Sequence, residues 1–373
     1  MEENKIALLT GSTGFLGSFL AKELLDKNYF LYLLARPKKN KSAFERVIES
    51  LKFVYEDEWT DKLLSRIKVI SGDITQDNLG IHSKKEIEEL IKEVEIIFHS
   101  AALAELRVPL EKIRKINVEG TRNILKFALK CKEKGRLKKV NHISTAYVVG
   151  KKITNFSEDM LDLGQEFNNT YEQSKFEAEL LINEFREKGL KISIFRPSII
   201  MGDSKTGKTN NFRMFYQPLH FFSLEIYKRF PANLKCAQNL INIDTVAKAV
   251  SILGEIEENS TYHIVSPEDT SVEFFMKLVS EYFGVELPEF IPVEEFDFNE
   301  WTSAQKTLAE PYIPYFNFKT KFLSQKTQQL LEEYDFTYPK IDENNLFNIF
   351  EYCCKRNFIK RKVYGYFEIN QKS

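Results

Sequence analysis

The stretch that decides the fold is residues 5–17, KIALLTGSTGFLG. Its first half is an apolar run typical of a buried strand, and residues 15–25 have the apolar spacing of a helix. Between them, Gly11 permits a tight turn, Gly14 lets a pyrophosphate approach the backbone, and Gly17 lets the helix pack closely on the strand. The free N–H groups at the start of the helix favour a phosphate. We therefore predict a dinucleotide-phosphate site at Gly11, Ser12, Thr13, Gly14, Phe15, Leu16 and Gly17.

Further apolar runs follow in the first 200 residues, and they alternate with longer stretches of helical spacing. Strands are predicted at residues 30–35, 67–71, 94–99, 139–144 and 192–196, and helices at about 109–132 and 170–188. This alternation predicts parallel βαβ units. The runs are continuously apolar, as expected when helices cover both faces of a sheet. The predicted fold class is therefore α/β, a Rossmann-type doubly wound parallel sheet.

The length of the chain predicts a second, smaller unit. A chain of 373 residues is long for one compact core. The βαβ rhythm stops after residue 196, and the chain then becomes rich in Phe and Tyr. We predict that residues 1–200 form the dinucleotide-binding Rossmann domain, completed by about 236–265. Residues 201–235 and 266–373 are predicted to form a mostly helical substrate-binding lobe.

Charge and cysteine content exclude several classes of protein. Lys and Arg (53) nearly balance Asp and Glu (54), so no strong field attracts nucleic acid. The four cysteines lack the paired spacing of a zinc site or a disulfide framework, which favours a cytoplasmic protein without a metal site. The N-terminus does not resemble a signal peptide, and no apolar stretch approaches the roughly 20 residues that span a bilayer. The oligomeric state is left open.

The residues after the second predicted strand indicate which dinucleotide is bound. An acidic side chain there holds the 2′-hydroxyl of NAD(H), whereas a cation favours the 2′-phosphate of NADP(H). Residues 34–39, LARPKK, contain no carboxylate, and the guanidinium of Arg36 can form a fork to phosphate and stack on adenine. We therefore predict NADP(H) in preference to NAD(H), with a solvated basic loop as the alternative.

Short motifs after the third and fourth predicted strands supply further cofactor contacts. Asp73 is positioned to meet the adenine amino group, or only to cap the following turn. Ala101 and Ala102 are small where the backbone must pass close to the cofactor. The predicted cofactor-binding residues therefore also include Asp73, Ile74, Ala101 and Ala102.

A tyrosine and a lysine four residues apart form the core of the predicted catalytic site. Tyr171 and Lys175 emerge on one face of a predicted helix, so the ammonium group can lie near the phenol and stabilise its anion. A tyrosine with an ordinary pKa of ~10 could then exchange a proton near neutral pH. Thr145, or alternatively Ser144, ends the preceding strand at the ligand-binding edge and can bind a substrate carbonyl. Asn117 could hold a water behind the lysine, or be a buried asparagine that bonds its own helix.

These motifs together resemble the extended short-chain dehydrogenase/reductases. The resemblance rests on residues 10–17, Asp73, HSAA at 99–102, NVEGT at 117–121, HISTAY at 142–147, YxxxK at 171–175 and FRPSIIMGD at 195–203. Within that family the chain is most similar to the branch of thioester reductase domains and fatty acyl-CoA reductases, the male sterility type. The similarity covers about residues 1–265, and the last hundred residues are only vaguely similar.

The resemblance implies a reductase with a Tyr-Lys mechanism. Tyr171 would donate a proton, Lys175 would bind the cofactor ribose and tune the tyrosine, and Thr145 would orient the carbonyl. Pro197, in the FRPS motif, would be a further cofactor contact. NADPH would reduce an acyl thioester, carried by coenzyme A or by a carrier protein, to an aldehyde and with a second hydride to an alcohol.

Other activities share most of this machinery. A nucleotide-sugar dehydratase needs an acid and a base after the catalytic threonine, where Ala146 and Tyr147 stand, so elimination is disfavoured. An epimerase would hold NAD tightly, and Arg36 argues mildly against that. A dehydrogenase acting on a ketone or a sterol-like alcohol would use identical residues. A sensor that binds the dinucleotide without turnover usually lacks the tyrosine or the lysine, and both are present here.

Two buried-strand histidines and a basic, aromatic stretch near the C-terminus are interpreted as structural features. His99 and His142 lie within predicted strands and are interpreted as satisfied buried histidines. Residues 355–367, KRNFIKRKVYGYF, mix basic and aromatic side chains. This stretch could contact a membrane surface or an acidic carrier protein, although a solvated helix end followed by packing aromatics is the commoner explanation.

Overall fold

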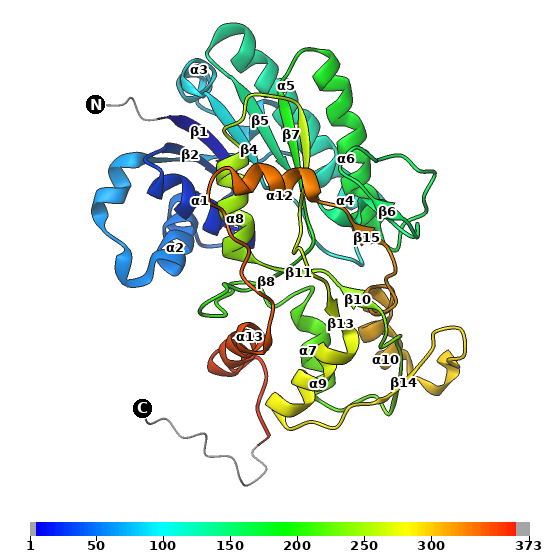
Figure 1. The fold of residues 1–373 in the computed structure, drawn as a ribbon. Helices are drawn as coiled ribbons and strands as arrows, with labels where there is room; N and C mark the ends of the chain where they lie inside the picture. Colours follow the sequence, from blue (N-terminus) through cyan, green and yellow to red (C-terminus); the bar gives the residue numbers. More distant parts are fainter. Residues whose placement is uncertain (1–4, 363–373) are drawn as a thin grey trace.

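The computed structural model describes residues 5–362, and its centre is a seven-stranded parallel sheet (Figure 1). The strand order is β12-β7-β5-β4-β1-β2-β3. These strands are β1 (Ile6–Thr10), β2 (Phe30–Ala35), β3 (Ile67–Ser71), β4 (Ile96–His99), β5 (Lys139–Ile143), β7 (Ile192–Pro197) and β12 (Ser260–Ile264). The chain runs outward from β1 to β3 and then restarts on the other side of β1 with β4. The carboxyl ends of β1 and β4 therefore flank the crevice in which such sheets bind ligands.

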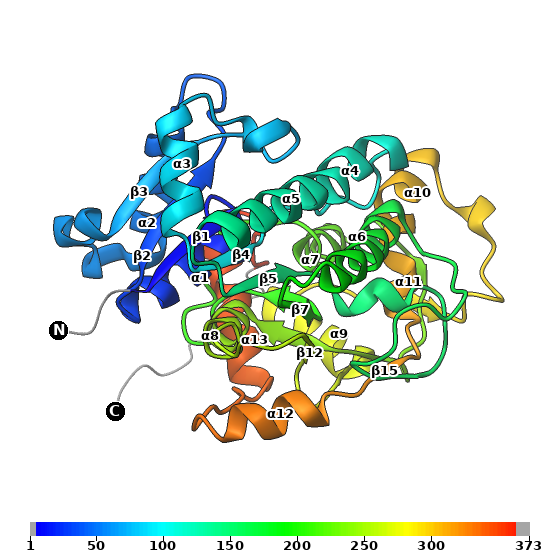
Figure 2. The ribbon, with the colours of Figure 1, turned by 90° about the horizontal axis from the view of Figure 1, so that it is seen from above.

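Helices cover both faces of the sheet (Figure 2). One face carries α1 (Phe15–Asp26), α2 (Ala43–Tyr55) and α8 (Ile243–Leu253), and the other carries α3 (Lys84–Glu93), α5 (Glu119–Lys134) and α6 (Thr170–Glu187). Every residue of β5 and β7 is buried, as expected for strands covered on both sides. The predicted α/β class with a Rossmann-type sheet is confirmed.

A second apolar core lies below the sheet in Figure 1. Its buried residues come from residues 201–240 and 272–359, and we call this part of the chain the aromatic lobe. Its helices are α7 (Tyr216–Ser223), α9 (Val272–Phe283), α10 (Ser303–Ala309), α11 (Ile313–Phe316) and α13 (Glu343–Lys355). Short strands pair as β9 (Arg229–Pro231) with β14 (Glu289–Ile291), β10 (Ala237–Gln238) with β13 (Thr270–Ser271), and β8 (Ile199–Met201) with β11 (Leu240–Asn242). Phe222 and Phe230 meet edge to face with ring centroids 4.9 Å apart, a favoured aromatic geometry.

One C-terminal segment leaves the aromatic lobe and returns to the sheet. β15 (Lys321–Phe322) pairs with β6 (Asn155–Phe156), and α12 (Gln325–Glu332) packs against α8 and β12. Leu331 and Phe336 belong to the core on that face of the sheet. The chain then crosses back to the lobe as α13, so the two cores are joined by several crossings. We call residues 321–336 the return segment.

The helix predicted at residues 109–132 is in fact two helices. α4 (Leu110–Asn117) ends before Val118, and α5 begins at Glu119. The hydroxyl of Thr121 donates to the carbonyl oxygen of Asn117 at 2.6 Å, and such side-chain bonds to the preceding turn bend helices. The prediction of one continuous helix was wrong at this point.

The end of the chain is only partly described. Phe358 and Ile359 pack into the aromatic lobe, and the ring of Phe358 stacks on Phe212 with centroids 4.6 Å apart. The described part of the stretch 355–367 therefore packs through Phe358 and Ile359. Residues 363–367 lie outside the described residues, so contact with a membrane or a carrier stays a prediction. Within residues 5–362, none of the helices combines the length and the apolar run that crossing a membrane requires.

Candidate active site

The glycine turn after β1 allows very close approaches between backbone segments. Gly11 has a φ of +79°, and a Cβ on it would lie 2.7 Å from the backbone nitrogen of Ala101. A Cβ on Gly17 would lie 2.1 Å from the carbonyl oxygen of Gly11. The hydroxyl of Ser12 is buried and has no hydrogen-bond partner among the described residues, and a phosphate oxygen would provide one. These features fit the predicted phosphate site.

Cations from two elements surround a hollow beside this turn. The exposed side chain of Arg36 pairs with the carboxylate of Asp73 at 3.4 Å. Arg46, on α2, was not predicted; its guanidinium donates to the carbonyl oxygen of Arg36 at 2.5 Å and to Oγ1 of Thr13 at 3.1 Å. The hollow has a volume of about 480 Å³ and is lined by Thr13, Lys38, Lys39, Asn40, Lys41, Arg46, Glu49 and Ser50. It lies where the 2′-phosphate of NADP(H) was predicted, although Arg36 itself is turned toward Asp73.

The carboxylate of Asp73 caps the turn after β3. Its Oδ1 accepts from the backbone nitrogen of Thr75 at 2.9 Å and from the Thr75 hydroxyl at 2.8 Å. Burial raises the pKa of Asp73, but the hydrogen bonds from Thr75 and the charge of Arg36 outweigh this and lower it. The capping alternative is therefore present in the structure, and adenine contact stays a prediction.

The other predicted cofactor contacts differ in position. Ala102 and Pro197 line the cavity described below. Ala101 donates its backbone N–H to Oγ1 of Thr10 at 3.2 Å and lies against Gly11, as expected for a small residue at a close approach. Ile74 is buried, and a Cβ on Gly120 would lie 2.7 Å from its Cδ1, so it packs on α5 rather than lining the cavity.

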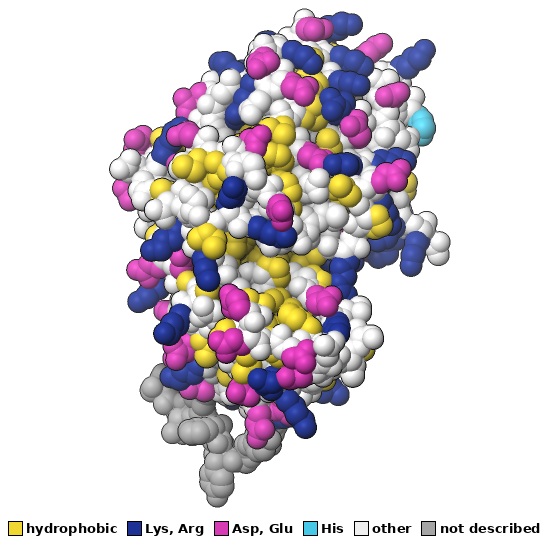
Figure 3. Space-filling view, turned by 90° about the vertical axis from the view of Figure 1, so that its right-hand side faces the viewer, with side chains coloured by type: hydrophobic (Ala, Val, Ile, Leu, Met, Phe, Trp, Pro, Cys, Tyr) yellow, Lys and Arg dark blue, Asp and Glu magenta, His cyan; other side chains and the backbone are white. Residues whose placement is uncertain are grey.

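One continuous cavity of about 760 Å³ joins the glycine turn to the aromatic lobe. The sheet domain contributes Gly11, Thr13, Gly14, Phe15, Leu16, Gly17, Ser144, Thr145, Tyr171, Lys175 and Pro197 to its lining. The aromatic lobe contributes Met214, Phe215, Tyr216, Gln238, Phe275, Tyr312, Tyr315 and Phe316. Figure 3 shows hydrophobic side chains gathered across the middle of one face, at the level where the lobe meets the sheet domain. The structure therefore brings most of the predicted cofactor turn together with Thr145, Tyr171 and Lys175 at one cavity, whereas Asn117 does not line it.

Tyr171 and Lys175 lie on the first turns of α6 and both line this cavity. Nζ of Lys175 donates to the carbonyl oxygen of Ile143 at 2.6 Å and lies 3.1 Å from Nε2 of His142. Burial lowers the pKa of Lys175 to about 8, while the carboxylate of Glu179 acts in the opposite direction. Burial is also the largest cause that raises the pKa of Tyr171, so its phenol keeps a proton at neutral pH. Tuning of the tyrosine by the lysine stays a prediction.

Thr145 and Ser144 are held in different ways. The hydroxyl of Ser144 donates to Oε1 of Glu179 at 2.5 Å. Oγ1 of Thr145 has longer contacts, donating to the carbonyl oxygen of Pro197 at 3.4 Å and accepting from the backbone nitrogen of Tyr147 at 3.3 Å. The Thr145 hydroxyl is therefore the freer of the two to bind a carbonyl, in line with the preference from the sequence.

Asn117 joins the loop after β4 to α6. Its Oδ1 accepts from the backbone nitrogen of Leu103 at 2.7 Å, and its Nδ2 donates to the carbonyl oxygen of Leu103 at 3.1 Å and to Oγ of Ser174 at 2.9 Å. The buried side chain thus positions α6 one residue before Lys175. Its predicted role in holding a water stays a prediction.

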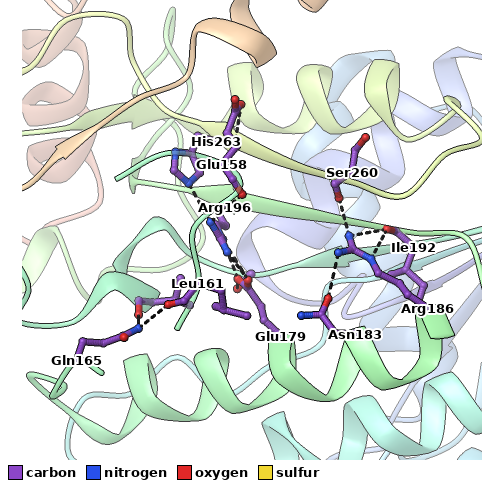
Figure 4. A network of polar contacts seen from close by, with 12 residues as sticks. Glu158, Leu161, Gln165, Glu179, Asn183, Arg186, Ile192, Arg196, Ser260 and His263 are labelled. Carbon is purple, nitrogen blue, oxygen red and sulfur yellow. Dashed lines mark hydrogen bonds and ion pairs between the residues drawn. The ribbon is translucent and has the colours of Figure 1, made fainter. Parts of the chain in front are cut away.

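A buried ion pair lies one turn beyond Lys175 on α6 (Figure 4). The carboxylate of Glu179 pairs with the guanidinium of Arg196, on β7, at 2.7 Å, and their side chains are 0% and 2% exposed. Because Ser144 also donates to Glu179, this carboxylate connects the end of β5, the catalytic helix and β7. The fully buried charges thus brace the helix that carries Tyr171 and Lys175.

The same network reaches the return segment. Arg196 donates to Nε2 of His263, 3.2 Å away (Figure 4). The Nδ1 of that ring donates to the carbonyl oxygen of Leu323 at 2.8 Å. The buried carboxylate of Glu158 accepts from both the backbone nitrogen and the hydroxyl of Thr327. Residues far beyond the predicted catalytic motifs therefore hold the sheet next to the site.

A third buried carboxylate, also missed in the sequence, binds α6 to the aromatic lobe. Glu172 accepts from the hydroxyl of Tyr315 at 2.7 Å and from the backbone nitrogen of Asn168 at 2.9 Å. Tyr315 also packs edge-on against Tyr147, with ring centroids 5.2 Å apart. Burial, partly offset by these hydrogen bonds, raises the pKa of Glu172. Glu172 directly follows Tyr171, so the lobe contacts the start of the catalytic helix.

The order reversal of the sheet at β1, the glycine turn and the Tyr171–Lys175 pair on one cavity define an extended short-chain dehydrogenase/reductase. The sequence profile of one such family, described as male sterility protein, matches residues 9–250. The chain belongs to this family.

Relatives by sequence are much longer proteins. The chain is 27% identical over 370 residues to a linear gramicidin synthase of Brevibacillus parabrevis, covering 93% of this chain and 7% of that protein. It is 33% identical over 331 residues to the nonribosomal peptide synthetase asaC of Aspergillus flavus, covering 84% and 31%. It is 30% identical over 258 residues to L-2-aminoadipate reductase of Saccharomyces cerevisiae, covering 65% and 18%. The chain thus spans less than a third of the length of each of these relatives.

Solved structures agree in fold. The terminal R domain from the myxalamid PKS-NRPS biosynthetic pathway is 27% identical, with a TM-score of 0.82 and coverage of 97% of this chain and 94% of that one. A UDP-glucuronic acid 4-epimerase from Bacillus cereus, solved with NAD, is 19% identical with a TM-score of 0.67 and coverage of 94% and 99%. At that identity the epimerase indicates a shared fold alone.

Proposed function

We propose that this protein is an NADPH-dependent reductase of an acyl thioester, which yields an aldehyde and, with a second reduction, an alcohol. One observation carries the proposal: Thr145, Tyr171 and Lys175 line the same cavity as the glycine turn and the aromatic lobe. A dinucleotide and an apolar acyl group can therefore meet beside a proton donor.

In the proposed reaction, Thr145, Tyr171 and Lys175 have separate roles. A bound NADPH supplies hydride to the carbonyl carbon. The hydroxyl of Thr145 hydrogen-bonds the carbonyl oxygen and orients it. Tyr171, whose pKa burial holds above the ordinary range, keeps its proton and donates it as negative charge develops on that oxygen. The ammonium group of Lys175 stabilises the tyrosinate that is left. The resulting hemithioacetal expels its thiol and leaves the aldehyde, with no covalent bond to the protein.

The preference for NADPH rests on the cations around the smaller hollow. Arg46 bonds the glycine turn through Thr13, and Lys38 lines both the hollow and the main cavity. A guanidinium can bind phosphate through two parallel hydrogen bonds. Arg46, Lys38 and Lys39 therefore favour a 2′-phosphate over a 2′-hydroxyl.

The lining of the aromatic lobe favours an uncharged acyl group. Phe215, Phe275 and Phe316 supply apolar surface, and Gln238 supplies an amide. Arg213 also lines the cavity, but its side chain is exposed and already pairs with Glu105. Buried charges need partners, so a charged acyl group, such as the one in the name of L-2-aminoadipate reductase, would be poorly held here.

The relatives support a substrate attached to a thiol. One is named as a gramicidin synthase and another as a nonribosomal peptide synthetase. A thiolation-reductase di-domain from an archaeal non-ribosomal peptide synthetase has a TM-score of 0.77 with 24% identity. We propose that the acyl group arrives on a carrier protein or as a coenzyme A ester.

The test is oxidation of NADPH by the purified chain with a long-chain acyl-CoA, followed by the loss of NADPH absorbance. Tyr171→Phe should abolish turnover and retain NADPH binding, because only the transferable proton is lost. Tyr334→Phe, at an exposed tyrosine, is the matched control and should behave as the wild type. Tight NADPH binding with turnover of a ketone or a nucleotide sugar, and none of any thioester, would overturn the thioester proposal and favour the dehydrogenase or epimerase alternative.

A further inference from the structure

Among the described residues, the ammonium group of Lys175 has two hydrogen-bond acceptors. An ammonium group carries three N–H donors in a tetrahedral arrangement. One points to the carbonyl oxygen of Ile143 at 2.6 Å, and a second to Nε2 of His142 at 3.1 Å. The Lys175 side chain also lines the cavity. Ile143 and His142 are neighbours on β5, and together they fix the direction of the third N–H.

The ring of His142 has an unusual hydrogen-bond state for a buried side chain. Burial, reinforced by the charge of Lys175, lowers its pKa well below the ordinary value, so the ring is neutral. If Nε2 accepts from Lys175, the ring proton is on Nδ1. That atom is buried and has no partner among the described residues. An unpaired buried donor costs free energy, so the stability of the fold does not account for this histidine.

The neighbouring His99 provides the contrast. Its Nδ1 lies 2.8 Å from Oγ1 of Thr10, and its Nε2 lies 3.1 Å from Oγ1 of Thr121. Both nitrogens are therefore paired, as expected of a structural histidine. The rings of His99 and His142 are 5.3 Å apart, and only that of His142 contacts Lys175.

We propose that His142 is a positioning residue for Lys175, whose Nε2 accepts one ammonium proton and thereby directs another into the cavity toward the phenol and the cofactor. The inference rests on the proposed function, because it assigns a part to His142 in that Tyr-Lys chemistry. It departs from the interpretation of His142 as a satisfied buried histidine.

The charges around Lys175 determine the expected pH effect. Glu179, on the same helix, raises its pKa, and the guanidinium of Arg196 is bound to that carboxylate. His99 and His142 face it as neutral rings from β4 and β5, and Tyr171 precedes it on α6. Burial lowers the pKa of Lys175 to about 8, so the ammonium form is lost as pH rises through that value. Removing an acceptor destabilises the ammonium form further, so it would be lost at lower pH.

The experiment compares His142→Leu with His142→Gln at saturating NADPH. The amide oxygen of glutamine can occupy the place of Nε2 and accept from Lys175, whereas leucine cannot. We expect kcat of the leucine variant to fall roughly ten- to a hundredfold, the range for losing a hydrogen bond to a charged group, with little change in KM. Its alkaline limb should move to lower pH, and the glutamine variant should recover most of both losses. His99→Leu should lower thermal stability without moving the alkaline limb.

A second readout separates this inference from the thioester proposal. The NMR signal of ¹³Cε-labelled Lys175, assigned by its absence in Lys175→Met, reports the pKa of the lysine without turnover. A lower pKa in His142→Leu and a restored one in His142→Gln support the inference even if no thioester is reduced. An unchanged pKa in both variants, or equal losses of kcat in both with equal losses of thermal stability, would overturn it.

Discussion

The buried pair of Arg196 and Glu179 leads to a quantitative prediction about stability. Both side chains are almost completely removed from solvent, and three N–O contacts of 2.7–3.1 Å join them. Arg196→Met removes the cation and leaves the carboxylate buried with the Ser144 hydroxyl as its one hydrogen-bond partner within residues 5–362. Breaking a buried pair from one side costs about 3–5 kcal/mol. The Arg196→Met variant should therefore lose about this much free energy of unfolding.

The double variant Arg196→Met, Glu179→Leu is the decisive comparison. Both charges are then absent and apolar groups of similar volume fill the space, so most of the loss should be recovered. Equilibrium unfolding in urea, followed by tryptophan fluorescence and by circular dichroism, measures all variants. A double variant as unstable as the sum of the two single ones, or single losses below about 1 kcal/mol, would refute the reasoning, because the pair would then be energetically unimportant.

Three further predictions concern the cofactor turn and the lobe. Arg46→Gln should raise the Kd for NADPH roughly tenfold or more and leave the Kd for NADH nearly unchanged, because a charged hydrogen bond to the 2′-phosphate is lost. Fluorescence titration with both cofactors measures the two Kd values. Equal losses of affinity for NADPH and NADH would contradict the prediction. Tyr315→Phe removes a donor to the buried carboxylate of Glu172 and should cost about 1.5–3 kcal/mol. Burial already raises the pKa of Glu172, so the folded state binds its proton more tightly than the unfolded state. The loss of unfolding free energy in Tyr315→Phe should therefore grow as pH rises above the ordinary carboxyl range. Unfolding measured at acidic and at neutral pH tests this. Gly17→Ala puts a Cβ 2.1 Å from the carbonyl oxygen of Gly11 and should lower the unfolding midpoint and weaken NADPH binding together, whereas normal binding would show that the turn can adjust.

The sequence predicted those parts of the structure whose residues lie close together along the chain. The strand, glycine turn and helix at residues 5–25 form one local unit, and a spacing of four residues is enough to put Tyr171 and Lys175 on one face of a helix. The parallel sheet was predicted from the continuously apolar runs, because strands buried on both faces lack the alternation of polar and apolar residues.

The parts that were missed depend on contacts between distant segments. Glu172 and Tyr315 are 143 residues apart, and nothing near Glu172 in the sequence indicates that a tyrosine will bind it. Arg46 belongs to a helix outside the motif after β2, and its approach to Thr13 follows only from the packing of α2. The break between α4 and α5 was missed because the Thr121 hydroxyl competes with the backbone in a way that apolar spacing does not reveal.

Two buried carboxylates that bind the C-terminal part of the chain limit how this protein can be re-engineered. One way to change the substrate preference is to exchange residues 201–362 for those of a relative and to keep the first 200 residues as a scaffold. Glu172 and Glu158, however, belong to that scaffold, and their donors Tyr315 and Thr327 belong to the exchanged part. A chimera that does not supply these hydroxyls would remove one hydrogen-bond donor from each of two buried carboxylates. Compatibility at these two positions is therefore a simple criterion for choosing a donor sequence before any pocket residue is considered.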